Sequence, residues 1–202
     1  AEVQDIGMEA MNRQAAQAER NLEWQKQGHL EWPVQLETYF KSHQITRLNW
    51  LKDNVVGTIL EVGCSWGYVL SYVGGHAGVD LNPENLALAR QLARRKVFHM
   101  AHAIALPFPD ASFNTVMLAD VLEHMEFEDV PQALAEARRV SAGRVLITLP
   151  QGDEDTDDAI NMKHRWLCTR ELAVRLFSSR NLETIPGFYC VRWEWEDGRI
   201  KK

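Results

Sequence analysis

The sequence predicts one doubly wound α/β domain behind an N-terminal helical extension. From residue 58 onward, short apolar runs alternate with segments of helical spacing, and strands separated by such helices form a parallel sheet with helices on both faces. With 202 residues, of which 46% are hydrophobic, the chain can bury one full core. No repeat or low-complexity linker interrupts the alternation. We expect strands near 58–62, 77–80, 96–99, 114–119 and 143–149, and helices near 67–74, 84–94, 130–140 and 169–178.

Both ends of the chain depart from this alternation of strand-like and helical segments. Residues 8–28 predict a polar helix, and residues 34–52 place apolar side chains at helical spacing and predict an amphipathic one. Residues 181–198 form two β-rich stretches around a Pro-Gly pair, which predicts an antiparallel hairpin at the edge of the sheet. The mostly parallel sheet then has seven strands. We divide the chain into a helical extension or lid, residues 1–56, and a core domain, residues 57–202.

The composition limits the classes of binding partner and the cellular compartment that we expect. The net charge of −6 gives no overall attraction to nucleic acid phosphates or anionic membranes. Three cysteines without CxxC spacing indicate neither a disulfide framework nor a cysteine-rich metal site, so a reduced, cytoplasmic setting is expected. No apolar stretch approaches the roughly 20 residues that span a bilayer. We expect no membrane partner, no nucleic acid partner, and a monomer or homodimer.

The stretch "ILEVGCSWGYVLSYVGGHAGVDLNP" (59–83) carries the clearest functional pattern. Gly63 and Gly67 bracket the turn after the first strand, where small residues let a ligand approach the backbone. Asp80 ends the second strand, where a carboxylate can accept hydrogen bonds from both hydroxyls of a ribose. Ser65 and Tyr68 stand where the dinucleotide pattern G-x-G-x-x-G requires glycine. The pattern favours another nucleoside ligand over a turn built for folding alone.

The order Glu61, Gly63, Gly67 gives E-x-G-x-x-x-G, and here the sequence resembles the class I S-adenosylmethionine-dependent methyltransferases, in particular the type 11-like family. The resemblance covers about residues 57–195. It implies a Rossmann-like methyltransferase fold, S-adenosylmethionine as cofactor and S-adenosylhomocysteine as product. Similar segments follow the first turn: "GVDLNPENLALAR" (78–90), "ALPFPDASFNTVMLADVLEHM" (105–125), "GRVLITLP" (143–150) and "HRWLCTRELAVRLF" (164–177).

The resemblance also implies roles for individual residues. His102 stands where the family commonly has an aspartate at the adenine amino group, and a neutral imidazole can still accept that hydrogen bond. The implied cofactor-binding residues are Glu61, Gly63, Cys64 and Gly67 around the methionine part, Asp80 at the ribose, Leu81, His102 and Ala103 at the adenine, and Ala119 near the sulfonium.

His124 is the candidate catalytic residue. It follows the fourth strand, where family members bring substrate and methyl group together. A hydroxyl nucleophile benefits from a base whose pKa lies near neutral, and histidine is the usual choice. The alternative is a structural histidine that is hydrogen-bonded beneath the site.

A metal site is a second interpretation of the same segment. Asp120, Glu123 and His124 are spaced i, i+3, i+4, so on a helical turn they share one face, and His164 arrives after the fifth strand. Carboxylate and imidazole together suit Zn²⁺, Mn²⁺ or Fe²⁺. The arrangement is similar to that of metal-dependent methyltransferases acting on the 3′-terminal ribose of small RNAs, although Asp120 is shorter than the usual glutamate. The metal requirement stays open.

Three functions are compatible with these patterns. The first is methyl transfer from S-adenosylmethionine to a small-molecule or glycan-type acceptor, at oxygen or nitrogen. The second is a metal-dependent RNA 3′-terminal ribose 2′-O-methyltransferase, which the net acidity and the acidic run at 151–158 disfavour. The third is a non-catalytic S-adenosylmethionine-binding regulatory protein.

Overall fold

The structure, a computed structural model, describes residues 42–152, 164–196 and 199–200. Most of the predicted extension, together with most of the acidic run at 151–158, lies outside the described residues. The predicted division at residue 56 therefore stays a prediction. In the part of the chain that is described, no helix is long and apolar enough to cross a membrane.

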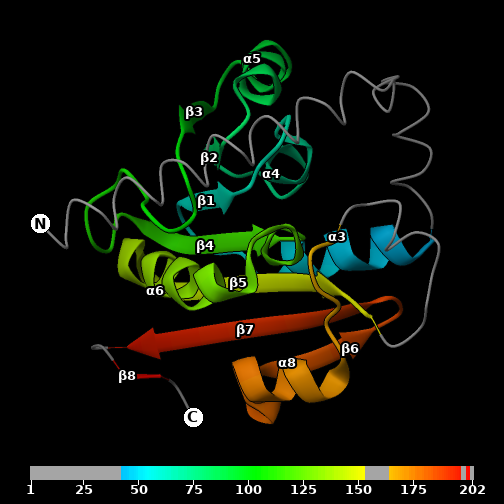
Figure 1. Cartoon of the computed structure of the whole chain (residues 1–202). Helices are drawn as coiled ribbons and strands as arrows, with labels where there is room; N and C mark the ends of the chain where they lie inside the picture. Colours follow the sequence, from blue (N-terminus) through cyan, green and yellow to red (C-terminus); the bar gives the residue numbers. More distant parts are fainter. Residues whose placement is uncertain (1–41, 153–163, 197–198, 201–202) are drawn as a thin grey trace, which may run out of the picture.

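A mixed sheet organises the fold, and its strand order is β3-β2-β1-β4-β5-β7-β6, with the short β8 paired to β7 (Figure 1). Strands β1 to β5 pair in parallel, whereas β7 pairs antiparallel with β5 and with β6. The predicted mostly parallel sheet is thereby confirmed: seven strands lie along its path, and β8 is an eighth at its side. The strands are β1 (Ile59–Val62), β2 (Ala77–Asp80), β3 (Val97–Met100), β4 (Phe113–Ala119), β5 (Ser141–Pro150), β6 (Leu182–Ile185), β7 (Phe188–Glu196) and β8 (Arg199–Ile200).

Helices cover both faces of the sheet, as a doubly wound fold requires (Figure 1). Alternate residues of β4 divide between two cores: Val116 and Leu118 pack with α6 and α8, and Met117 packs with α3, α4 and α5. Strands buried on both faces are mostly apolar, which is why the sequences of β4 and β5 contain continuous hydrophobic runs. The helices are α3 (Ser42–Asn54), α4 (Tyr68–Tyr72), α5 (Pro83–Leu92), α6 (Val130–Val140) and α8 (Arg170–Phe177), with 3₁₀ turns η1 (Leu122–His124), η2 (Phe127–Asp129) and η3 (Ser179–Asn181).

Local residues explain where the helices begin and end. The side chain of Asn82 accepts hydrogen bonds from the backbone N–H groups of Glu84 and Asn85, and Pro83 occupies the first turn of α5. Helix α4 is shorter than the predicted 67–74, because Gly67 and Gly74 adopt φ angles of 76° and 77°, outside the right-handed helical region.

The C-terminal hairpin is confirmed, with Gly187 at φ 80° in its turn. Its longer strand, β7, lies inside the sheet between β5 and β6, and its pairing with β5 runs from Pro150–Phe188 to Arg144–Glu194. Helix α3 joins this part of the sheet to the parallel part, because the Trp50 indole N–H donates to the Glu183 carboxylate over 2.9 Å.

Candidate functional site

The carboxyl ends of four neighbouring strands, β3-β2-β1-β4, bring the predicted cofactor residues to one edge of the sheet (Figure 1). Ligands of open α/β sheets bind beyond these ends. The residues at this edge are the turn from Gly63 to Gly67 after β1, Asp80 and Leu81 at β2, His102 and Ala103 after β3, and Ala119 at β4.

The turn after β1 depends on its glycines. Gly63 has φ 72°, and a Cβ there would lie 2.3 Å from Cγ2 of Val121. Gly67 has φ 76°, and a Cβ there would lie 2.9 Å from the Phe98 ring. Ser65 between them also has a positive φ, 47°, which few non-glycine residues adopt. The backbone is thus bent tightly at the point where a ligand would approach it.

Asp80 holds this turn. Its carboxylate accepts the backbone N–H of Ser65 over 2.8 Å and that of Asn82 over 2.8 Å, with the Asn85 amide at 3.5 Å. Burial raises the pKa of Asp80, and these hydrogen bonds oppose the shift. The carboxylate stands at the carboxyl end of β2, where an acidic residue binds the ribose of a nucleotide in folds of this kind. Asp80 therefore fits a ribose-binding role, and it also ties the turn after β1 to the end of β2.

Two of the predicted cofactor residues direct their side chains into the protein. The Glu61 carboxylate is buried and accepts the Leu70 N–H of α4 over 2.8 Å, and burial raises its pKa to about 8. Cys64 packs in the core beside Gly78, and a Cβ on Gly78 would lie 2.6 Å from the Cys64 sulfur. Burial raises the pKa of the Cys64 thiol. Their side chains anchor the turn in the core.

Arg47 is a residue of this region that the sequence analysis missed. It projects from α3, is 1% exposed, and its Nη1 lies 2.5 Å from Oδ2 of Asp120. Its guanidinium lies 5.2 Å from the centre of the Phe188 ring. Burial raises the pKa values of Glu61 and Glu123, and the charge of Arg47 partly opposes that rise. The available signal was a cation one turn before Leu51 on the apolar face of the predicted helix.

Asp120 does not share a helical face with Glu123 and His124, so that prediction was wrong. The 3₁₀ turn η1 begins only at Leu122, and Asp120 itself adopts a φ of 53°. Its second oxygen accepts the Thr148 hydroxyl over 2.7 Å. With one oxygen paired to Arg47 and the other to Thr148, Asp120 is committed to linking α3, β4 and β5.

Glu123, His124 and His164, in contrast, meet as predicted from the two sides of the site. One ligand atom from each lies within 4.8 Å of the other two, and the histidine rings are 5.0 Å apart. Glu123 is 1% exposed, and its two carboxylate oxygens and Nε2 of His164 are buried without a hydrogen-bond partner among the described residues. Burial raises the pKa of Glu123 and lowers that of His164.

Contacts outside the cluster hold its two halves together. The backbone N–H of Arg165 donates to the carbonyl of Glu123 over 2.8 Å, and the Arg165 guanidinium pairs with Glu126. The rings of Phe127 and Trp166 meet edge to face at 5.3 Å. The segment that carries His164 is therefore docked onto the turns that follow β4.

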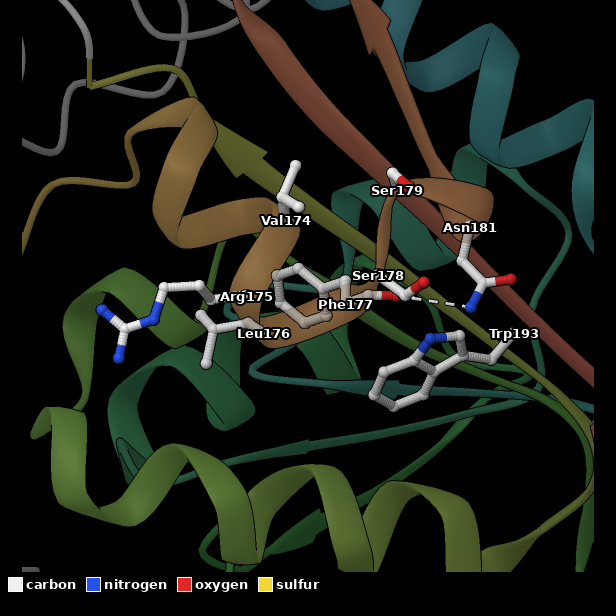
Figure 2. Close-up of a pocket in the computed structure, with 8 residues that line it drawn as sticks. All are labelled: Val174, Arg175, Leu176, Phe177, Ser178, Ser179, Asn181 and Trp193. Carbon is white, nitrogen blue, oxygen red and sulfur yellow. Dashed lines mark hydrogen bonds between the residues drawn. The ribbon is translucent and has the colours of Figure 1, made fainter.

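A separate hollow of about 460 Å³ lies between the end of α8 and β7. There the Asn181 amide donates a hydrogen bond to the Phe177 carbonyl, and the Trp193 ring lies below that amide (Figure 2). Trp193 pairs with Val145 in the middle of β5. The hollow contains none of the predicted site residues.

Comparisons with known proteins agree with this geometry. The family described as "Methyltransferase domain" matches residues 60–147, from β1 into β5. The chloroplastic tocopherol O-methyltransferase of Arabidopsis thaliana is 28% identical over 156 residues, which are 70% of this chain and 41% of that protein. The chain spans about half or less of the length of the curated relatives it matches.

Solved structures share the fold. One from Thermotoga maritima, described as a possible histamine N-methyltransferase, superposes with a TM-score of 0.63 over 80% of this chain and 94% of that chain, at 17% identity. Magnesium protoporphyrin IX methyltransferase from Synechocystis, solved with bound S-adenosylmethionine, gives a TM-score of 0.55 over 75% and 77%, at 15% identity.

Proposed function

We propose that the chain is a class I S-adenosylmethionine-dependent methyltransferase, and that it transfers the methyl group of S-adenosylmethionine to a small-molecule or glycan-type acceptor, at oxygen or nitrogen. When bound, the cofactor supplies a sulfonium methyl group, which passes to an acceptor lone pair as the carbon–sulfur bond breaks and its electrons stay on sulfur. S-adenosylhomocysteine and a proton leave with the methylated acceptor.

One observation carries the cofactor part of this proposal. The glycine turn after β1 and the Asp80 carboxylate at the end of β2 lie on adjacent strands and are joined by the Ser65 N–H. A ribose diol needs a carboxylate acceptor, and a compact charged group needs a close backbone approach. The residues present therefore fit a nucleoside such as S-adenosylmethionine.

We propose that the acceptor binds beyond the next strand of the sheet, β4. Beyond Ala119, at the end of β4, the chain turns through Asp120 into η1, which carries His124. Holding an acceptor in line with the methyl group here accounts for much of the acceleration. In a metal-free site, His124 is placed to take the proton of an acceptor hydroxyl. A small acceptor is supported by the relationship to a tocopherol O-methyltransferase and by the net negative charge, which disfavours nucleic acid.

Calorimetric titration with S-adenosylmethionine and S-adenosylhomocysteine tests the proposal directly. Asp80→Ala should weaken binding by at least about 1.5 kcal/mol, roughly tenfold, because it removes charge-assisted hydrogen bonds. The matched control is Asp53→Ala, an exposed aspartate on α3, which should bind like the unaltered protein. Unchanged affinity in Asp80→Ala removes this residue from the site, and preferential binding of NAD overturns the proposal.

Acceptor identity is then tested by mass spectrometry. The protein is incubated with pools of hydroxyl- and amine-bearing metabolites and glycans together with S-adenosylmethionine, and products heavier by one methylene are sought. Formation of S-adenosylhomocysteine together with such a product supports the proposal. Cofactor binding without any turnover across the pools favours the non-catalytic function instead.

A further inference from the structure

We propose that Glu123, His124 and His164 form a binding site for one divalent transition-metal ion, such as Zn²⁺ or Mn²⁺, just beyond the end of β4. The donors are one carboxylate and two imidazoles, a set that suits such ions. Three protein ligands also leave a coordination position open, as in catalytic zinc sites.

The spacing of the three side chains is close to what an ion requires. Their candidate ligand atoms lie within 4.8 Å of one another. In a tetrahedral zinc site with bonds of about 2.0–2.2 Å, neighbouring ligand atoms are about 3.4 Å apart. The ligand atoms therefore have to approach one another by at most about 1.4 Å to surround an ion.

The burial of unsatisfied groups is the second, independent observation. Both carboxylate oxygens of Glu123 and Nε2 of His164 lack a hydrogen-bond partner among the described residues. Burying a polar group without a partner is unfavourable, and burying a charged one is more so. A cation between these atoms would satisfy them. The cationic side chain of Arg47 is already paired with Asp120.

The backbone around the cluster is held in place by contacts that do not involve the proposed ligands' side chains. Arg165 bonds to the Glu123 carbonyl and pairs with Glu126, and the Phe127 and Trp166 rings pack together. These contacts fix His164 against Glu123 from a segment about 40 residues later in the chain. A site preorganised in this way does not require folding around the ion.

Access and charge also fit an ion that meets a substrate. Glu123 is buried, while His124 and His164 are each half-buried, so the cluster can be reached from its histidine side. One carboxylate and a divalent ion leave a net positive charge, which suits an oxygen-bearing acceptor in the open position. This role rests on the proposed function: His124 then serves as a ligand rather than a base, and the ion lowers the pKa of the acceptor hydroxyl.

Metal binding is measured on the full, untagged chain, so that no polyhistidine tag competes. The protein is treated with a chelator, dialysed, and titrated with Zn²⁺ by calorimetry and with Co²⁺ by visible absorption, which reports the ligand geometry. We expect one ion per chain. Glu123→Gln and His164→Ala should each weaken binding at least about 100-fold, because loss of an outer-shell partner alone costs 10–100-fold.

His99→Ala is the matched control, since His99 is an exposed histidine on β3, at the far edge of the parallel strands. It should bind the ion as the unaltered chain does. Circular dichroism and S-adenosylhomocysteine binding report whether each variant folds. No saturable binding to the unaltered chain, or equal binding by a folded His164→Ala chain, overturns the metal site. Metal binding without S-adenosylhomocysteine binding leaves the metal site intact and overturns the proposed function, so the two failures are distinguishable.

Discussion

Replacing Arg47 by methionine should strongly destabilise the protein. The guanidinium is 1% exposed and pairs over 2.5 Å with an Asp120 carboxylate that is 20% exposed. Methionine preserves most of the volume and removes the charge, so the loss reports on electrostatics rather than on a cavity. Among the described residues, the side chain of Asp120 then keeps the Thr148 hydroxyl as its hydrogen-bond donor.

The size of the effect follows from the burial of the pair. Removing one partner of a buried ion pair costs about 3–5 kcal/mol, because the remaining charge is left without compensation. Two charges about 4 Å apart at an effective dielectric constant near 20 interact by about 4 kcal/mol, which agrees. The partial exposure of Asp120 lets water replace some of the lost interaction. We therefore expect a loss of about 3 kcal/mol in the free energy of unfolding.

Urea unfolding followed by circular dichroism measures this loss. Adding Asp120→Asn to Arg47→Met should recover about 1–2 kcal/mol, because the double variant no longer buries an unpaired charge. Lys52→Met is the control: Lys52 is an exposed cation on the same helix, 5.2 Å from the Tyr72 ring, and should change stability by about 1 kcal/mol or less. The reasoning is refuted if Arg47→Met unfolds within about 1 kcal/mol of the unaltered protein.

Three further predictions concern the turn after β1 and its supports. Burial raises the pKa of Glu61 to about 8, so the folded state retains a proton that the unfolded chain releases near 4.5. The free energy of unfolding therefore falls as the pH rises between these two values. Glu61→Gln should remove that part of the decline, at most about 5 kcal/mol, in urea unfolding measured across pH 5–8. Gly63→Ala should be more destabilising than Gly74→Ala in thermal unfolding. Both glycines have positive φ, but a Cβ at 63 would collide with Val121, whereas one at 74 would meet nothing within 4 Å. Equal decreases in Tm for the two variants would contradict the collision. Asn82→Ala should lower the free energy of unfolding by about 1 kcal/mol through loss of the α5 cap, and the same urea assay should show no change if the cap is unimportant.

Much of the fold could be predicted from local patterns in the sequence. The apolar runs of β1 and β4, with helical spacing between them, predicted the parallel sheet, and the helix predicted near 84–94 begins at Pro83, one residue earlier. Such features depend on interactions a few residues apart, which periodicity and capping residues report. The glycine turn and Asp80 were predicted as neighbours because strand ends meet at one edge of a parallel sheet.

Contacts between distant parts of the chain were harder to predict. The pairing of β7 with β5 inside the sheet, and the approach of His164 to Glu123, join segments some 40 residues apart or more. The sequence placed His164 in the same region, but it could not show that Arg165 docks that segment on Glu123 and Glu126.

The sequence by itself determined the elements, the turn chemistry of Gly63 and the residue types at the strand ends. Only the tertiary structure decided that Arg47 pairs with Asp120. Asp120 is therefore not among the candidate metal ligands, which are Glu123 and the two histidines. The physical reason is that a buried charge takes the partner that packing brings within reach, and packing is set by helices and strands far apart in the chain.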